Sequence, residues 1–371
     1  LLYHTLEKKL FSPVYGWKVT STPQMQSALK ENKLACWLSL EGGHIIENSV
    51  EILEFFASLG IRSMTLTHSK NTDWADSSGD SPRWDGLNAL GKKIVTRMEE
   101  FRMIIDVSHS SDDTLEDVLD VTSAPLMASH SNARALCDIP RNLPDDLIKE
   151  IAARKGYIGV NFFPVFLKKT IYEQARKNVE KYEQQYKEML QRNADDPDSI
   201  SREESDLNQK YVIGNDSVDL NAVIDHIDHI AEIGGIDCIG LGSDFDGINS
   251  TPSDLTDVSC YPALVEGLTV RGYTPKEIQK IMGLNLYYLM KRRPPRSTQE
   301  ESIYTKRCSQ KKNDANSQDN GCPKRGYGIG GGHPLPAAYL VHHACLVQLS
   351  IAQSSLSLGG HDRLITHLLH R

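Results

Sequence analysis

Five ionisable side chains each follow a short apolar run of the chain. They are Glu41, His68, His109, His130 and Asp244. Short apolar runs that end at a turn are typical of buried strands. In a parallel α/β barrel the carboxyl ends of the strands meet at one mouth, and catalytic groups are collected there from several strands. The repeated pattern therefore predicts that the five side chains share one site.

The types of these residues favour a metal site. Imidazole nitrogens and carboxylate oxygens are ligands that zinc takes in proteins, and a carboxylate has two oxygens with which to hold two ions about 3.5–4 Å apart. A single histidine at a strand end is more often a hydrogen-bonded structural residue, but five such residues in one register favour a shared centre. By contrast, His44, His226 and His229 fit no ligand position, and strand alternation turns Asp246 away from the site.

Strand-like and helix-like patterns alternate along most of the chain. The strand-like runs lie at 33–40, 61–67, 102–108, 124–129, 156–162 and 238–243. Such alternation predicts a parallel sheet with crossover helices. We expect an α/β fold of the TIM type, a (β/α)₈ barrel whose first one or two strands are missing from this chain upstream of residue 1. The alternation is observed, whereas the count of eight comes from analogy.

The composition divides the chain into a barrel and a tail. We expect a barrel domain over residues 1–291, incomplete at its N-terminus, with a charged helical insertion at 167–216. From about residue 292 to 371 the sequence is rich in Ser, Gln, Asn, Lys and Gly without a sustained period, which predicts a disordered tail.

Charge and hydropathy restrict the classes of partner. The net charge of −8 and the lack of a basic stripe argue against a nucleic-acid partner. No apolar run reaches the roughly 18 residues of a membrane span, and the first residues lack a signal-peptide pattern. The seven cysteines have no metal-ligand spacing and leave the compartment open.

A set of motifs, in this order, resembles the membrane (renal-type) dipeptidase family of zinc metallopeptidases. The resemblance covers residues from about 20 to 290, and its fold is that of metallo-dependent hydrolase-like barrels. The motifs are Glu41-Gly-Gly-His, Leu66-Thr-His-Ser with Asn71 and Trp74-Ala-Asp76, Asp106-Val-Ser-His109, Ser129-His-Ser131, Arg141-Asn, and Gly242-Ser-Asp-Phe-Asp-Gly247.

The resemblance implies a zinc-dependent dipeptidase that hydrolyses one peptide bond through a metal-bridging hydroxide. Of its two zinc ions, both would be held by Glu41 and one by His109 and His130. His68 would lie near the carbonyl oxygen of the scissile bond and stabilise the oxyanion; its alternative role is to fix the loop that follows it. Asp244 would contact the nucleophilic water and the substrate amine and carry a proton between them.

Substrate selection is the role that the resemblance implies for Arg141. Its guanidinium would pair with the terminal carboxylate of the dipeptide, although Arg141 could equally serve only as a helix-entry residue. The family analogy further suggests a homodimer and a membrane-associated or extracellular location, but the tail shows no clear lipid-anchor pattern.

One family feature is absent from the sequence. The second zinc of these enzymes takes a His-x-Asp pair on the first strand, and no such pair precedes Glu41. Because the other site residues remain, we favour a truncated form of an active enzyme. The alternatives are an inactive relative or fragment that lacks the His-x-Asp ligands, and a barrel metallohydrolase acting on another amide or on a phosphoester.

Overall fold

The structure is a computed structural model, and it describes residues 16–193, 197–214, 216–295 and 347–349. Seven strands form one parallel sheet in which each strand pairs with the next along the chain. They are β1 (Gly16–Lys18), β2 (Leu34–Leu40), β3 (Ser63–Thr65), β4 (Ile104–Asp106), β5 (Met127–Ala128), β6 (Tyr157–Val160) and β7 (Ile239–Leu241). An eighth strand, β8 (Val347–Leu349), pairs antiparallel with β2.

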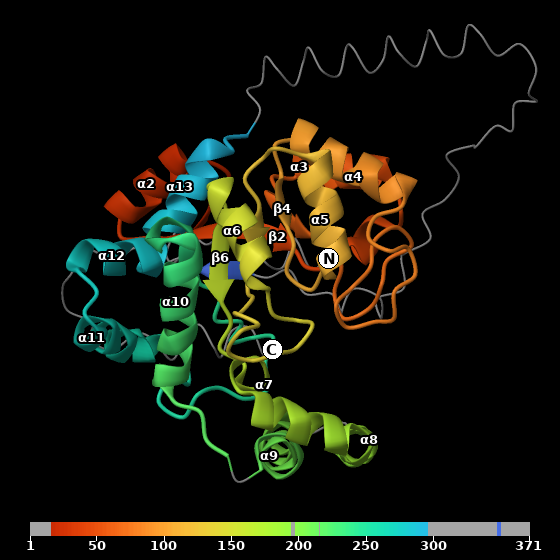
Figure 1. Cartoon of the computed structure of the whole chain (residues 1–371), viewed down its shortest axis with the longest axis vertical. Coiled ribbons are helices and arrows are strands. Elements are labelled where there is room, and N and C mark those ends of the chain that lie inside the picture. The colour runs from red at the N-terminus through yellow and green to blue at the C-terminus, as the bar shows by residue number, and fades with distance from the viewer. Residues whose placement is uncertain (1–15, 194–196, 215, 296–346, 350–371) are drawn as a thin grey trace, which may run out of the picture.

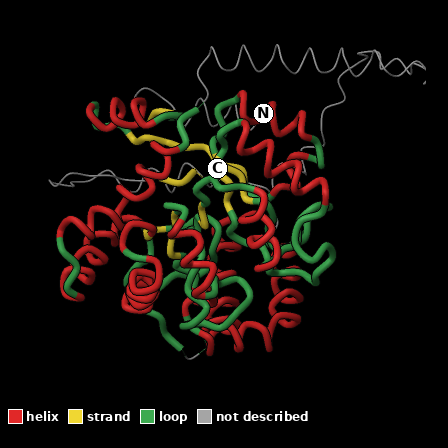
Figure 2. The backbone as a smooth tube through the Cα atoms, turned by 45° about the horizontal axis from the view of Figure 1, so that its top comes forward, coloured by secondary structure: helices red, strands yellow, loops and turns green. Residues whose placement is uncertain are grey.

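The sheet is curled into a half-barrel inside a shell of helices (Figure 2). Every strand predicted from the sequence is present, although each is shorter than its apolar run. Among the described residues no pairing joins β7 to β1, so the α/β class is confirmed and the closed eight-stranded barrel stays a prediction.

Two short strands were missed by the sequence. The first strand-like run expected from the sequence begins at residue 33, whereas in the structure β1 and then α2 (Thr22–Lys30) precede β2. Three residues are too few to show a period of two, which explains the omission. Apart from residues 292–295 and β8, the predicted tail at 292–371 lies outside the described residues.

The helices cover the sheet and connect its strands (Figure 1). After α2 they are α3 (Val50–Ser58), α4 (Ala89–Glu100), α5 (Asp112–Val121), α6 (Asp145–Ala153), α7 (Pro164–Leu167), α8 (Lys169–Arg192), α9 (Pro197–Asn208), α10 (Leu220–Gly234), α11 (Tyr261–Arg271), α12 (Pro275–Gln279) and α13 (Asn285–Arg292). Within the described ranges, no helix has both the length and the apolarity needed to cross a bilayer.

Side-chain caps begin several of these helices. Ser49, Asn88, Ser111 and Asp219 each accept a hydrogen bond from a backbone N–H of the first turn. Each cap satisfies a donor that the helix itself leaves unpaired, which stabilises a helix by about 1 kcal/mol. The caps therefore fix where the crossover helices start after the strand-end loops.

One large apolar core lies between the sheet and its helices. Met64, Ile105 and Ile158 of the strands pack there with Ile94 of α4 and Ile227 of α10. A second apolar cluster packs α2 and α13 against the strands of the sheet. It includes Val19, Met25, Trp37 and Leu289. Burying side chains of this size contributes about 1.5–3 kcal/mol each, and this rigid base supports the strand-end side chains.

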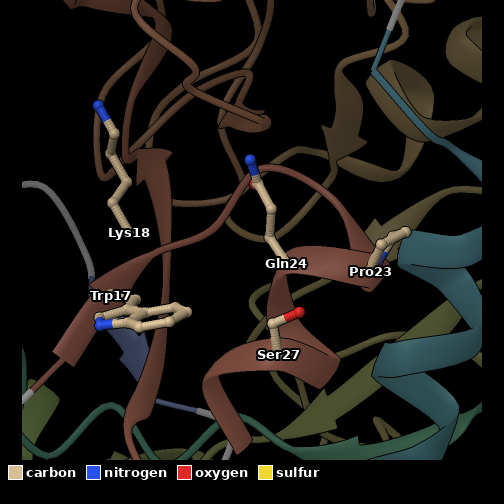
Figure 3. Close-up of a pocket in the computed structure, with 5 residues that line it drawn as sticks. All are labelled: Trp17, Lys18, Pro23, Gln24 and Ser27. Atoms are coloured by element: carbon tan, nitrogen blue, oxygen red, sulfur yellow. The ribbon is translucent and has the colours of Figure 1, made fainter. Parts of the chain in front are cut away.

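Two further features lie outside this core. The helices of the charged range 167–216 sit at the bottom of Figure 1, and α8 buries only Ile171 and Met189 among its residues. Beside β1 and α2 lies a hollow of about 540 Å³ lined by Trp17, Lys18, Pro23, Gln24 and Ser27. Figure 3 shows these side chains, with Lys18 extending away from the Trp17 ring.

Candidate metal and catalytic centre

The strand-end residues converge as the sequence predicts. Glu41 directly follows β2, His68 lies three residues after β3, His109 three after β4, His130 two after β5 and Asp244 three after β7. Because parallel strands share one direction, all five positions fall at the same end of the sheet. The common direction of the strands thus places these side chains at one mouth of the sheet.

Glu41 lies at the centre of the cluster. Its Oε1 is 3.2 Å from Nε2 of His130 and 3.4 Å from Nε2 of His109. The two Nε2 atoms are 2.8 Å apart, and Nε2 of His68 is 4.0 Å from the same carboxylate oxygen. One carboxylate oxygen and imidazole nitrogens from three strands therefore face a common point.

This donor set fits a zinc ion. Zinc bonds of about 2.0–2.1 Å in a tetrahedron place the ligand atoms about 3.3 Å apart, close to the spacing within Glu41, His109 and His130. A second grouping, Glu41 with His68 and His109, has its ligand atoms within 4.8 Å of one another. His130 is the better ligand candidate, because its side chain is 4% exposed and nearer to Glu41, whereas that of His68 is 45% exposed.

Charge and burial oppose each other at these groups. Burial raises the pKa of Glu41, but the hydrogen bonds and charges of His109 and His130 outweigh it and hold that pKa well below the usual range. Burial and the Arg141 charge lower the pKa of His109. For His130, burial lowers the pKa, yet the charges of Asp244 and Glu41 raise it overall. The lowered pKa values of Glu41 and His109 favour the ionised carboxylate and the neutral imidazole that a metal requires, whereas the raised pKa of His130 favours its protonated ring, which must lose a proton before it binds a metal.

The backbone at the mouth is unusual at two of the five strand-end residues. His109 has φ = 68° and Asp244 has φ = 64°, both in the left-handed region. Non-glycine residues avoid that region, and such strain tends to be retained at functional sites. After Glu41, Gly42 has φ = 93°, and a Cβ on Gly43 would come within 2.4 Å of the Trp74 ring. The glycine pair is therefore needed to turn the chain away directly after the carboxylate.

Asp244 stands beside the imidazole cluster and has one partner that the sequence did not suggest. Asn161 donates from Nδ2 to Oδ2 of Asp244 at 3.1 Å and is fully buried at the end of β6. Burial raises the pKa of Asp244, while the charge of His130 opposes that rise. Asn161 directly follows β6 in the structure, but it lies inside the apolar run at 156–162, so the strand-end rule did not select it.

Arg141 brings a buried cation to the same mouth. It donates from Nη2 to the carbonyl oxygen of His130 at 2.7 Å and from Nη1 to Oγ of Ser131 at 2.8 Å, with its guanidinium over the Phe166 ring. Burial lowers its pKa to about 10, against the charges of Asp244 and Glu41. Within the described chain no carboxylate lies at ion-pair distance from Arg141, and its Nε has no hydrogen-bond partner. A buried cation in this state is suited to an anionic ligand.

The long loop at 69–86 is anchored to the site. Ser77 donates from Oγ to the carbonyl oxygen of His68 at 2.5 Å, and Ser78 donates from its backbone N–H to the carbonyl oxygen of His109 at 2.8 Å. Asp76 accepts three backbone N–H groups of the loop, from Arg83, Trp84 and Gly86. This motif carboxylate shapes the loop and does not join the metal cluster.

The three histidines predicted to be structural have partners away from the cluster. His44 contacts the carbonyl oxygen of Asn71, and His229 contacts Asp145. His226 accepts the N–H of Ala133 at Nδ1 and contacts the carbonyl oxygen of Leu167 at Nε2. It thus ties α10 to the segment that follows His130.

Comparison with known proteins gives a consistent set of relatives. Residues 17–301 match the sequence profile described as membrane dipeptidase (peptidase family M19). Dipeptidase 3 of Macaca fascicularis is 32% identical over 273 residues, which are 72% of this chain and 46% of that protein. The chain thus spans about half the length of this curated relative.

Two solved structures share the fold. The probable dipeptidase PvdM of Pseudomonas aeruginosa superposes with a TM-score of 0.66 and 28% identity, over 78% of this chain and 76% of that one. A metallopeptidase of Rhodobacter sphaeroides, solved with a phosphinate mimic of the dipeptide L-Ala-D-Ala, gives 0.59 and 25%, over 74% and 68% of the two chains.

Proposed function

This chain belongs to the membrane dipeptidase family, peptidase family M19, and from that premise we propose that it is a zinc-dependent dipeptidase. One observation carries the proposal: a carboxylate and two imidazoles from three strands meet within 3.4 Å, beside a buried arginine that pairs with no carboxylate of the described chain. The first part suits a metal and the second suits the carboxylate of a short peptide.

The proposed metal ligands are Glu41, His109 and His130. Three protein ligands with an open position are typical of catalytic zinc, and zinc there supplies the Lewis acid that lowers the pKa of an attacking water to about 7. Glu41 has a second oxygen to share with a second ion, which would need ligands beyond this cluster.

The remaining site residues bind and orient the substrate. Arg141 pairs with its terminal carboxylate and so limits the length of peptide beyond the scissile bond. Asp244 takes a proton from the attacking water and returns it to the leaving amine, a role that suits a carboxyl group whose pKa burial raises. His68, the most exposed of the three imidazoles, donates to the oxygen of the scissile carbonyl as negative charge develops there.

A matched pair of substrates tests the proposal. The purified chain, loaded with zinc, should hydrolyse an unblocked dipeptide and lose that activity in a chelator. The same dipeptide with its carboxylate converted to an amide should be cleaved at least about 100-fold more slowly, because it cannot pair with Arg141. Equal cleavage of both would favour a metallohydrolase of other amides, and zinc binding without cleavage of either would favour an inactive relative.

A further inference from the structure

A chain of three buried serine hydroxyls runs beneath the proposed metal site. Ser129 Oγ is 2.7 Å from Nδ1 of His130 and 3.4 Å from Oγ of Ser108, which in turn is 3.1 Å from Oγ of Ser131. Arg141 donates to Oγ of Ser131 at 2.8 Å. The three serines are at most 5% exposed. The hydroxyls therefore connect a metal-ligand candidate to the substrate-binding arginine.

The groups at the two ends of this series of hydroxyls restrict the direction in which their hydrogen bonds can run. Arginine can only donate, a serine hydroxyl donates one hydrogen while it accepts others, and a neutral imidazole donates at one nitrogen and accepts at the other. If the hydroxyl hydrogens run from Ser131 toward His130, Nδ1 accepts and Nε2 carries the ring hydrogen. If they run the other way, Nδ1 donates to Ser129, and Nε2 has a lone pair directed toward Glu41.

Only the second direction leaves His130 able to ligate a metal through Nε2. A metal-ligating histidine usually donates its other N–H to a fixed acceptor, which sets both the tautomer and the ring orientation. Ser129 is that acceptor here, and its own hydrogen passes to Ser108 while that of Ser108 passes to Ser131. Ser131 then receives hydrogens from Ser108 and Arg141.

In this state the hydrogen of Ser131 has no acceptor among the described residues. Its Oγ has hydrogen-bond partners there only in Oγ of Ser108 and Nη1 of Arg141. A carboxylate bound by Arg141 would supply the missing acceptor. When a metal is bound at His130, the Ser131 hydroxyl is therefore free to donate a second hydrogen bond to the carboxylate that Arg141 binds.

We infer that Ser129, Ser108 and Ser131 are positioning residues that couple metal binding at His130 to carboxylate binding at Arg141. The inference deepens the proposed function, and it rests on that function for the identity of the metal and of the carboxylate ligand. Coupling of this kind is reciprocal, so each ligand strengthens binding of the other.

The first test measures zinc alone. In the metal-free full chain, competition with a chromophoric chelator should show that S129A binds zinc about 10–100-fold more weakly than the parent, as loss of a ligand's hydrogen-bond partner typically does. Ser110 offers a matched control, because it adjoins His109 and its buried Oγ has no hydrogen-bond partner in the described chain. S110A should change zinc affinity by less than about twofold.

A conservative variant separates positioning from folding. S129T keeps the hydroxyl and should restore zinc affinity to within about threefold of the parent. Equal zinc affinity in S129A and the parent would overturn the inference, and so would an equal loss in S129T and S129A when both are folded by circular dichroism.

The second test measures the coupling with acetate as the carboxylate probe. Acetate should tighten zinc binding by at least about fivefold in the parent and leave it unchanged in S131A. Equal tightening in both proteins would mean that acetate acts without the serine chain, and the coupling would be wrong. Neither test uses peptide hydrolysis, so a chain that fails to cleave dipeptides can still pass both.

Discussion

The strand-end mouth and the hollow beside β1 and α2 differ in the groups that they bring together. The mouth holds Glu41, His109 and His130 at contact distance. The hollow of Figure 3 has a volume of about 540 Å³, and the only charged side chain among the residues lining it is Lys18. A large apolar pocket with convergent polar groups is the usual first candidate for a binding site. Here the convergence of polar groups, and not the volume of a hollow, selects the candidate site.

Backbone geometry shows the same contrast. His109 and Asp244 at the mouth have left-handed φ values, whereas none of the residues that line the hollow does. Holding charged and strained groups in place costs free energy, which the surrounding hydrogen bonds and core must offset. A region that carries this cost is the better candidate for function, and the following changes test the contrast.

The largest expected effect comes from removing the central charge of the mouth. E41Q keeps the shape of the side chain but loses a charged ligand, so dipeptide hydrolysis should fall by at least about 10³-fold, equivalent to about 4 kcal/mol of transition-state stabilisation. Initial rates and zinc content measured on the same samples check this. Activity within tenfold of the parent would show that the mouth is not the catalytic site.

His226, which ties α10 to the segment after His130, tests the effect of burying a neutral histidine on stability. Burial lowers its pKa from 6.5 to about 4, so between these values the unfolded chain binds one more proton than the folded chain. Stability from this group is therefore present above about pH 6.5 and is lost as the pH falls toward 4, to a total of about 3 kcal/mol. In urea titrations of the metal-free protein across this window, H226Q should reduce the slope of unfolding free energy against pH. An unchanged slope would contradict the assignment.

Arg141 sharpens the comparison by separating binding from chemistry. R141A should raise KM for an unblocked dipeptide about 100-fold, because removing one partner of a buried charge pair costs about 2–5 kcal/mol, while kcat falls much less. The amidated dipeptide supplies the control, since its KM should be nearly the same in both proteins. Steady-state kinetics with zinc content verified would decide, and equal KM values for the unblocked substrate would remove Arg141 from substrate binding.

The smallest effect is expected in the hollow. S27Y places a large side chain beside Trp17 on an exposed face of α2. Because the hollow has no part in the proposed chemistry, kcat/KM and zinc affinity should stay within about twofold of the parent. A tenfold loss of activity with the fold intact would reverse the comparison.

Most residues of the candidate site could be predicted from the sequence, because they occupy equivalent positions at the ends of strands. Glu41, His68, His109, His130 and Asp244 all end apolar runs, so one rule about parallel strands predicted that they would meet. Asn161 was missed because the apolar run continues past it into Phe162 and Phe163, whereas the strand itself ends at Val160. The serine chain was not predictable, since the Oγ contacts of Ser108, Ser129 and Ser131 depend on side-chain rotamers and on the relative register of β4 and β5.

The sequence likewise predicted most strands of the fold but not all of them. Alternating patterns found the strands from β2 to β7 because their apolar runs are long enough to show a period. Neither β1 nor β8 has such a run, and β8 comes from a part of the sequence whose composition resembles disorder. The pairing of β8 with β2 is a long-range contact that no local pattern contains.

Anomalous diffraction at the zinc edge, from crystals of the zinc-loaded chain, tests the central claim most directly. We predict a peak within about 2.0–2.2 Å of a Glu41 carboxylate oxygen and of Nε2 of both His109 and His130. A fully occupied zinc elsewhere in the chain, with no peak between these three side chains, would contradict the account.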